Sequence, residues 1–347
     1  MTLQELAGIE LPIVQAPMAG VQGSALAIAV CNAGGLGSLP CAMLAPDAIR
    51  RELAAIRAAT SKPFNVNFFA HVDPEADARR ESAWREALAA FYREFGIDPA
   101  TIPVGPGRAP FGPEAADVLE EFRPAVVSFH FGLPPAPLLA RVKAMGSKVF
   151  SSATTVAEAR WLEDHGADAI IAQGMEAGGH RGMFLTEDLT TQVGTFALLP
   201  QVLREVTVPV IAAGGIADAS GVAAAVSLGA AGVQVGTSYL LCPEATTSAV
   251  HRAALKGEGA RHTALTNIFT GRPARGIVNR IMREIGPISA AAPAFPLAVG
   301  GVAPLRARAE SAGSGDFSPL WSGQNATGCR EIPAGHLTVE LAGLAEY

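Results

Sequence analysis

A glycine-rich stretch with a histidine at its tip is the part of this sequence best suited to chemistry. Residues 169–182 read AIIAQGMEAGGHRG, in which a short apolar run leads into four glycines and His180. Glycine lets the backbone approach a flat ligand closely, and an imidazole can take or give a proton near neutral pH. A surface turn with an incidental histidine would explain the same residues, because turns are commonly rich in glycine.

Segments of similar character follow other apolar runs. In QAPMAG, the small residues around Pro17 leave room for a planar ring to rest on the backbone of Ala16 and Met18. In FNVNFF, alternation directs the amides of Asn65 and Asn67 to one side of a strand, and the Asn67 amide can both donate to and accept from a heteroaromatic edge. Either asparagine could instead serve a turn or a strand edge.

Two glycine-rich turns predict a phosphate site. Gly214 and Gly215 follow one apolar run and precede Asp218, a plausible helix N-cap, and the next apolar run leads into residues 234–237, QVGT. Backbone amides at such turns can face an anion without a clashing Cβ. In a (β/α)8 barrel, the turns after strands seven and eight commonly hold a phosphate.

These positions together describe a long ligand with a phosphate at one end and a polar ring over the centre, which is the shape of FMN. A sugar phosphate would also fill the phosphate site, but it would leave Met18, Asn67 and Gln173 without a role. The predicted cofactor contacts are Ala16, Pro17, Met18, Asn67, Gln173, Gly178, Gly179, Gly214, Gly215, Gln234, Val235, Gly236 and Thr237.

The elements that must position these residues alternate between strand and helix. Eight strands are expected, at Ile13–Ala16, Gly35–Leu39, Phe64–Phe69, Ala125–Phe129, Lys148–Ser152, Ala169–Ala172, Val208–Ala212 and Gly232–Val235. Near-continuous apolar strands separated by helical patterns indicate a parallel sheet. No GxGxxG follows the first strand, and polar or glycine-rich residues follow strand after strand. Both features favour a (β/α)8 TIM barrel over an open doubly wound sheet.

The chain divides into a barrel and a smaller lobe. We expect the barrel over 1–256, with 71–113 as an extended helical excursion, a lobe inserted over the C-terminal face of the barrel at 257–312, and a C-terminal segment, 313–347, that returns to the barrel. The lobe contains the segment TGRPARG. Within the excursion, Trp84, Leu88, Phe91 and Phe95 recur at helical spacing, which predicts a buried face rather than a binding face.

Composition restricts the partners and the location. The net charge of −6 argues against a nucleic-acid face or an anionic membrane surface as the main partner. No basic leader precedes an apolar core at the start of the sequence, and no apolar run approaches about 20 residues, so a cytoplasmic protein without a membrane span is expected. The four cysteines lack metal-ligand spacing and are expected to be reduced thiols, without a structural metal.

The motifs QAPMAG, FNVNFF, SFHFGLP, AQGMEAGGHRG, AAGGI and GVQVGT, in this order and spacing, resemble the nitronate monooxygenase family, formerly called 2-nitropropane dioxygenases, and in particular its class I members. A looser likeness extends to TGRPARG and to LWSGQNA at 320–326. The resemblance implies a barrel that holds FMN non-covalently. It also implies that His180 is the acid/base residue above the flavin and that His130, from SFHFG, helps to hold an anionic substrate. A core histidine satisfied by backbone is the other interpretation of His130.

The reaction implied by the resemblance is oxidation of alkyl nitronates, such as propionate 3-nitronate, by O2 to a carbonyl product and nitrite. An NAD(P)H-dependent FMN reductase of the quinone or enoyl-thioester type is an alternative on the same scaffold, and a non-catalytic flavin-binding protein is another. A homodimer is possible. Class I relatives often place a tyrosine and a lysine from the segment near 290–310 in the substrate pocket, and this segment has neither. Tyr239 and Arg306 are possible substitutes.

Overall fold

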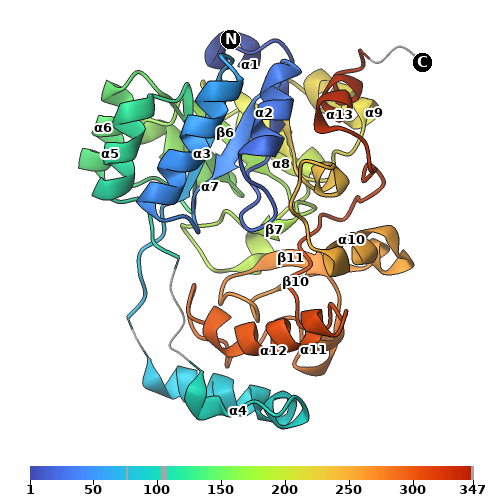
Figure 1. Ribbon diagram of the computed structural model, residues 1–347. Helices are drawn as coiled ribbons and strands as arrows, with labels where there is room; N and C mark the ends of the chain where they lie inside the picture. The colour runs from blue at the N-terminus through green and yellow to red at the C-terminus, as the bar shows by residue number, and fades with distance from the viewer. Residues whose placement is uncertain (76, 103–107, 345–347) are drawn as a thin grey trace.

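The computed structural model describes residues 1–75, 77–102 and 108–344, which form a barrel with a smaller lobe at one end (Figure 1). Residues 76 and 103–107 of the expected excursion, and 345–347 of the expected C-terminal segment, lie outside the described residues. Helix α1 (Leu3–Ala7) lies at the end of the barrel opposite the lobe. Among the described residues, no helix has both the length and the apolar character that crossing a bilayer requires.

The barrel sheet contains eight parallel strands in the order β1-β9-β8-β6-β5-β4-β3-β2. Their bounds are β1 Ile13–Gln15, β2 Gly37–Pro40, β3 Phe64–Phe69, β4 Val126–His130, β5 Lys148–Ala153, β6 Ala169–Gln173, β8 Val210–Ala213 and β9 Gly232–Val235. A parallel bridge between Val14 and Leu36 closes the ring from β1 to β2. The Leu36 amide donates to the Ile13 carbonyl at 2.8 Å, and the Gln15 amide donates to the Leu36 carbonyl at 3.0 Å. The predicted (β/α)8 barrel is therefore confirmed.

Amphipathic helices cover the outside of the barrel. They are α2 Ser24–Asn32, α3 Pro46–Ala59, α5 Pro113–Phe122, α6 Ala136–Ala144, α7 Val156–Asp164, α8 Thr195–Leu203, α9 Ala219–Ser227 and α13 Ala334–Leu341. In α3, Pro46 occupies the first turn, where its missing N–H costs little, and Ile49, Leu53 and Ile56 are buried at helical spacing. The Asp218 side chain caps α9 by accepting from the Gly221 amide at 2.8 Å.

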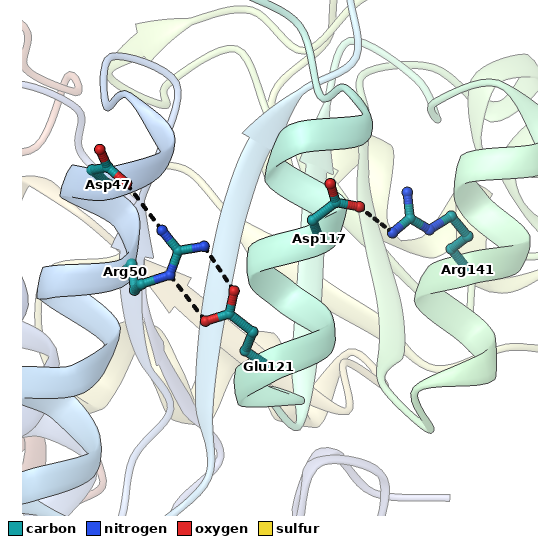
Figure 2. A network of polar contacts seen from close by, with 5 residues as sticks. All are labelled: Asp47, Arg50, Asp117, Glu121 and Arg141. Atoms are coloured by element: carbon teal, nitrogen blue, oxygen red, sulfur yellow. Dashed lines mark hydrogen bonds and ion pairs between the residues drawn. The ribbon is translucent and has the colours of Figure 1, made fainter.

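Charged side chains join three of these helices on the surface (Figure 2). Arg50 of α3 donates twice to Glu121 of α5, at 2.7 and 2.9 Å, and once to Asp47 at 3.0 Å. Arg141 of α6 donates to Asp117 of α5 at 2.6 Å. The carboxylates are exposed and the two arginines partly exposed, so water and salt screen these ions.

The lobe has its own sheet and its own core. Its antiparallel strands are β10 Thr263–Thr266, β11 Ala274–Ile277 and β7 Gly179–His180, in the order β10-β11-β7. Its helices are α4 Ala78–Glu94, α11 Arg280–Glu284 and α12 Val299–Ser311. The remaining short elements are α10 Ala249–Lys256 and the 3-10 helices η1 Pro99–Thr101, η2 Leu189–Thr191, η3 Thr237–Leu241 and η4 Glu258–Arg261.

Helix α4 packs with the lobe, although it precedes most of the barrel in the sequence. Trp84, Leu88 and Phe91 are buried, as their spacing predicts, in one cluster with Val302 of α12 and Phe317. The Trp84 indole donates to the Ala298 carbonyl at 3.2 Å. In Figure 1, α4 and α12 lie together at the far end of the lobe. The excursion from the barrel thus supplies one side of the lobe.

Candidate functional site

The carboxyl ends of the barrel strands open into a cleft of about 1320 Å³, part of which is continuous with solvent. Every residue predicted to bind cofactor or substrate lines this cleft, with the exception of Val235. The Val235 side chain is buried in the hydrophobic core of the barrel, and its carbonyl accepts from the Ala16 amide at 2.8 Å.

One end of the cleft is formed by the two predicted glycine-rich turns. Gly214 and Gly215 have φ values of 118° and 74°, a conformation that L side chains rarely adopt. Within the described residues, the amides of Gly214, Gly215 and Gly236 donate to no main-chain carbonyl, so they can receive an anion. A Cβ on Gly236 would lie 3.2 Å from the Ala16 Cβ, which keeps this turn close to the end of β1.

A segment near the C-terminus completes this end of the cleft. The Gly323 amide donates to the Thr237 hydroxyl at 3.0 Å, and the Asn325 side chain donates to the Gly215 carbonyl at 3.0 Å. Trp321, Gly323 and Asn325 all line the cleft. The residue-level predictions missed them, and the only signal for them was the likeness in LWSGQNA at 320–326.

Amide side chains line the middle of the cleft. The Asn67 amide donates to the Ser128 hydroxyl at 2.9 Å, and Asn65 donates to the same hydroxyl from deeper in the barrel, also at 2.9 Å. The two asparagines therefore share a side of β3, as predicted, but only Asn67 lines the cleft. The Gln234 side chain also lines the cleft, and its buried Oε1 has no hydrogen-bond partner within the described residues. Such an acceptor is costly unless a ligand satisfies it.

Hydrogen bonds from neighbouring side chains hold the loop that carries His180 in place. Gln173 donates to the His180 carbonyl at 2.9 Å and accepts from the Gly182 amide at 2.7 Å, so both ends of its side chain are used by the loop. Arg181 is fully buried and donates to the carbonyls of Gly174 and Gln173 at 2.7 and 2.8 Å. No pattern in the sequence predicts a buried arginine beside His180.

Aromatic rings surround the His180 imidazole. The centroids of Phe69, Phe131, Phe295 and Trp321 lie 5.9, 5.8, 5.4 and 5.7 Å from its own. Burial holds the pKa of His180 well below its ordinary value, and the positive charges of Arg108 and other nearby cations lower it further. The imidazole is therefore neutral at pH 7, which a proton acceptor requires.

The lobe also contacts the imidazole: His180 Nε2 lies 2.9 Å from the hydroxyl of Thr270. Thr270 belongs to TGRPARG and is only 3% exposed. On its backbone side, His180 pairs with Ala274 in the β7–β11 ladder. The lobe therefore contacts both the ring and the backbone of His180.

His130 also lines the cleft, but both of its ring nitrogens are engaged. Nε2 lies 3.1 Å from the His180 carbonyl and Nδ1 lies 3.0 Å from the Ser152 hydroxyl. A carbonyl only accepts, so Nε2 carries the proton and Nδ1 accepts from Ser152. Burial lowers the pKa of His130 to about 4. His130 therefore has features of both a substrate-binding histidine and a core histidine, because it faces the cleft while a backbone carbonyl accepts from one of its ring nitrogens.

Tyr239 and Arg306 are the candidate substitutes for the missing pocket tyrosine and lysine, but the cation that lines the cleft is Arg108. Tyr239 is fully buried beneath the cleft, with its hydroxyl 2.9 Å from that of Thr338, and Arg306 on α12 pairs with Glu310 at 2.7 Å. Neither lines the cleft, whereas Arg108 does. Among the described residues that line it, none is an aspartate or a glutamate, so the charge facing a ligand is positive.

The chain is similar to known proteins along nearly its whole length. The family model described as nitronate monooxygenase matches residues 1–343. A nitronate monooxygenase of Pseudomonas aeruginosa is 44% identical over 337 residues, 96% of this chain and 95% of the relative. A nitronate monooxygenase of Paraburkholderia phytofirmans is 42% identical over 341 residues, 98% of this chain and 93% of the relative.

Two solved structures resemble the fold. The nitroalkane oxidase from Streptomyces ansochromogenes superposes with a TM-score of 0.89 at 40% identity, covering 98% of this chain and 96% of its own. FabK from Thermotoga maritima superposes with a TM-score of 0.75 at 31% identity, covering 99% and 96%. The site geometry and these similarities lead to one conclusion: the chain belongs to the nitronate monooxygenase family.

Proposed function

We propose that this cleft oxidises alkyl nitronates with bound FMN as the cofactor and His180 as the acid/base residue. Oxidation of nitronates is the activity of the family to which the chain belongs. The observation that carries the site assignment is a neutral imidazole among aromatic rings at one place in the cleft, together with turn amides at another that have no main-chain acceptor among the described residues.

The residues that face the cleft fit FMN. Within the described residues, the amides of Gly214, Gly215 and Gly236 donate to no main-chain carbonyl and suit a phosphate. Oε1 of Gln234 likewise has no partner there and needs a donor, which a ligand with polar ring edges supplies. Asn67 also lines the cleft wall, and although its side-chain nitrogen donates to Ser128, its side-chain oxygen accepts no hydrogen bond within the described residues. When bound, FMN supplies the redox chemistry by taking electrons from the substrate and passing them to O2.

The chain's own contribution is position, charge and proton transfer. A nitronate is already an anion, and the cleft meets it with the Arg108 guanidinium and no opposing carboxylate among the described lining residues. A neutral nitroalkane must first lose its α-proton, and the neutral His180 imidazole can accept that proton. The rings of Phe69, Phe131 and Phe295 surround this imidazole and reduce its contact with water.

The second candidate is a reductase that takes hydride from NAD(P)H. The likeness to FabK at a TM-score of 0.75 favours this reductase as the alternative function. One fold can support different reactions, so the same barrel and lobe could serve either. The test is oxygen consumption by flavin-loaded protein on adding propionate 3-nitronate, with an NADH-only control. Oxygen uptake with release of nitrite, and none with NADH, is expected. Anaerobic reduction of the flavin by NADH without any response to nitronate would establish the reductase instead.

His180→Asn tests the acid/base assignment. Asparagine keeps a polar group but cannot accept the α-proton, so turnover of a neutral nitroalkane should fall by roughly 10²–10⁴-fold. Oxidation of a preformed nitronate should fall much less, and the content of bound flavin should stay the same. Loss of flavin in this variant would show that His180 has a structural role instead.

A further inference from the structure

Thr270 is the one hydrogen-bond partner of the His180 ring within the described residues, and it comes from the lobe rather than the barrel. Its hydroxyl oxygen lies 2.9 Å from Nε2, and the side chain is buried. Thr270 does not line the cleft, so it cannot contact a substrate that occupies the cleft. Its influence on the reaction must act through His180.

The hydroxyl group has a single proton and two neighbours. Besides His180 Nε2, it lies 3.4 Å from the carbonyl oxygen of Arg272, towards which it can donate. A carbonyl oxygen can only accept, whereas an imidazole nitrogen can either donate or accept. If the hydroxyl donates to the carbonyl of Arg272, it must accept a proton from Nε2–H. In a neutral imidazole, Nδ1 then carries the lone pair.

The other ring nitrogen of His180 is free to react. Nδ1 makes no hydrogen bond within the described residues, and it is not among the buried polar atoms that lack a partner. Because the ring lines the cleft, this nitrogen is accessible from the cleft. A proton acceptor placed there needs its lone pair on Nδ1, which is what the contact with Thr270 provides.

We propose that Thr270 is a positioning residue that holds His180 in the Nε2–H tautomer, so that Nδ1 is the nitrogen that accepts the substrate proton. The inference rests on the proposed role of His180 as the base. It assigns a function to TGRPARG in the lobe: this segment sets the protonation pattern of a residue on the barrel loop.

The turn that carries Thr270 is held firmly in place. The Gly271 amide donates to the Asn267 carbonyl at 2.7 Å, and a Cβ at Gly271 would lie 2.2 Å from the Pro293 carbonyl oxygen. Asn267 in turn accepts from the Ser289 amide at 2.9 Å. A hydroxyl mounted on such a turn has a fixed direction, so it can select one tautomer.

Charges around His180 come from several elements, and replacement of Thr270 leaves all of them unchanged. They are Arg108 before α5, His130 at the end of β4, Arg272 between β10 and β11, and His71 after β3. Burial and, after it, these groups set the general level of the His180 pKa. A change in that pKa on removing only the hydroxyl therefore reports the hydrogen bond.

Thr270→Val removes the hydroxyl at nearly constant volume, and Thr270→Ser keeps it. For a neutral nitroalkane, kcat/KM should fall about tenfold in Thr270→Val, a part of the roughly 10²–10⁴-fold that a positioned base supplies. Thr270→Ser should restore most of it. Loss of an acceptor for Nε2–H disfavours the imidazolium, so the acid limb of the pH profile should move to lower pH in Thr270→Val. A move to higher pH would mean that Thr270 donates to Nε2, and would overturn the proposal.

The control is Thr263→Val in β10. Thr263 accepts from Arg275 at 3.1 Å and has no contact with His180, so the same substitution there should leave the pH profile in place. An equal shift in both variants would reduce Thr270 to a general structural role and would also overturn the proposal.

A second measurement does not depend on turnover. The ¹⁵N spectrum of histidine-labelled protein, with the His180 signals assigned by their loss in His180→Asn, should show a protonated Nε2 and an unprotonated Nδ1 at pH 7. In Thr270→Val both signals should move towards the average of the two tautomers. A protonated Nδ1 in the wild type would refute the tautomer even if nitronates are oxidised. Conversely, the expected spectrum without nitronate oxidation would leave the tautomer standing and remove the proposed reaction.

Discussion

Arg108 is the residue whose replacement should change substrate binding most directly. It lines the cleft, and burial lowers the pKa of its guanidinium, which the positive charge of Arg306 lowers further. A hydrogen bond to a charged group contributes about 1.5–3 kcal/mol, so Arg108→Gln should raise the KM for a nitronate roughly tenfold or more. Steady-state oxygen uptake measures this effect.

Arg306→Gln is the matched control for Arg108→Gln. Arg306 lies on α12, pairs with Glu310 and does not line the cleft, so its loss removes the same charge without removing a ligand contact. Its KM should stay close to that of the wild type. Equal KM values for Arg108→Gln and the wild type would exclude Arg108 from substrate binding.

At the scale of single residues, the sequence predicted the site residues that belong to motifs after the barrel strands. It missed the site residues that other parts of the chain contribute. Asn67 lies in β3, and His180 and the turn glycines lie on loops that follow barrel strands, whose carboxyl ends share one face. Thr270 reaches the surroundings of His180 from the lobe, and Arg108 reaches them from the segment before α5. Sequence spacing contains no information about such a meeting, because it depends on how the lobe packs on the barrel.

At the scale of elements, the turn after β10 should tolerate substitution poorly. Gly271 has a φ of 91°, and an added Cβ would lie 2.2 Å from the Pro293 carbonyl oxygen. Gly146 has a φ of 83° with nothing within 4 Å of an added Cβ. Gly146→Ala should therefore cost only the backbone term of about 1–2 kcal/mol, and Gly271→Ala about 1–3 kcal/mol more. Urea unfolding of both variants measures the difference, and equal costs would contradict the close packing of this turn.

The outer helices should depend on their buried faces rather than on the surface ions of Figure 2. Leu53 of α3 is fully buried, so Leu53→Ala should lower the free energy of unfolding by about 2–5 kcal/mol. Arg50→Ala on the same helix should lower the Tm far less, and added salt should shrink that difference further. A larger effect for Arg50→Ala, measured by thermal unfolding, would show that the ion network is a major support for α3 and α5.

Helix α4 shows that a sequence pattern can predict a buried helix face without predicting the surface against which it packs. Its apolar spacing correctly predicts a buried face, but the pattern is the same whether the face meets the barrel or the lobe. At the start of α7, Thr155 caps the helix by accepting from the Glu158 amide at 3.2 Å. The Glu158 carboxylate instead turns inward and accepts from Thr154 and Phe184, which no local rule anticipates.

At the scale of the whole molecule, buried histidines should make the fold sensitive to acid. Burial lowers the pKa of His130 and of His251 to about 4, while unfolded histidine titrates near 6.5. Between these values the unfolded chain binds more protons than the folded chain, so stability falls as the pH drops below 6.5. Each histidine contributes a slope of up to about 1.4 kcal/mol per pH unit.

Urea midpoints measured from pH 7.5 to pH 4.5 test this dependence. The slope should be small above pH 7 and should grow below pH 6.5. His251→Gln should flatten it, because glutamine does not titrate, whatever the variant does to stability at pH 7. An unchanged slope would assign the acid sensitivity to other groups.

The walls of the cleft come from segments that are synthesised early and from segments that are synthesised late. Its walls include Ala16 from the first strand and Asn325 from a segment that follows the lobe, and the side chain of Asn325 holds the turn at Gly215. A ribosome releases the barrel strands first and this last wall only after more than three hundred residues have been joined. A nascent chain that ends before residue 325 therefore lacks part of this wall and the hydrogen bond that Asn325 makes to the Gly215 turn.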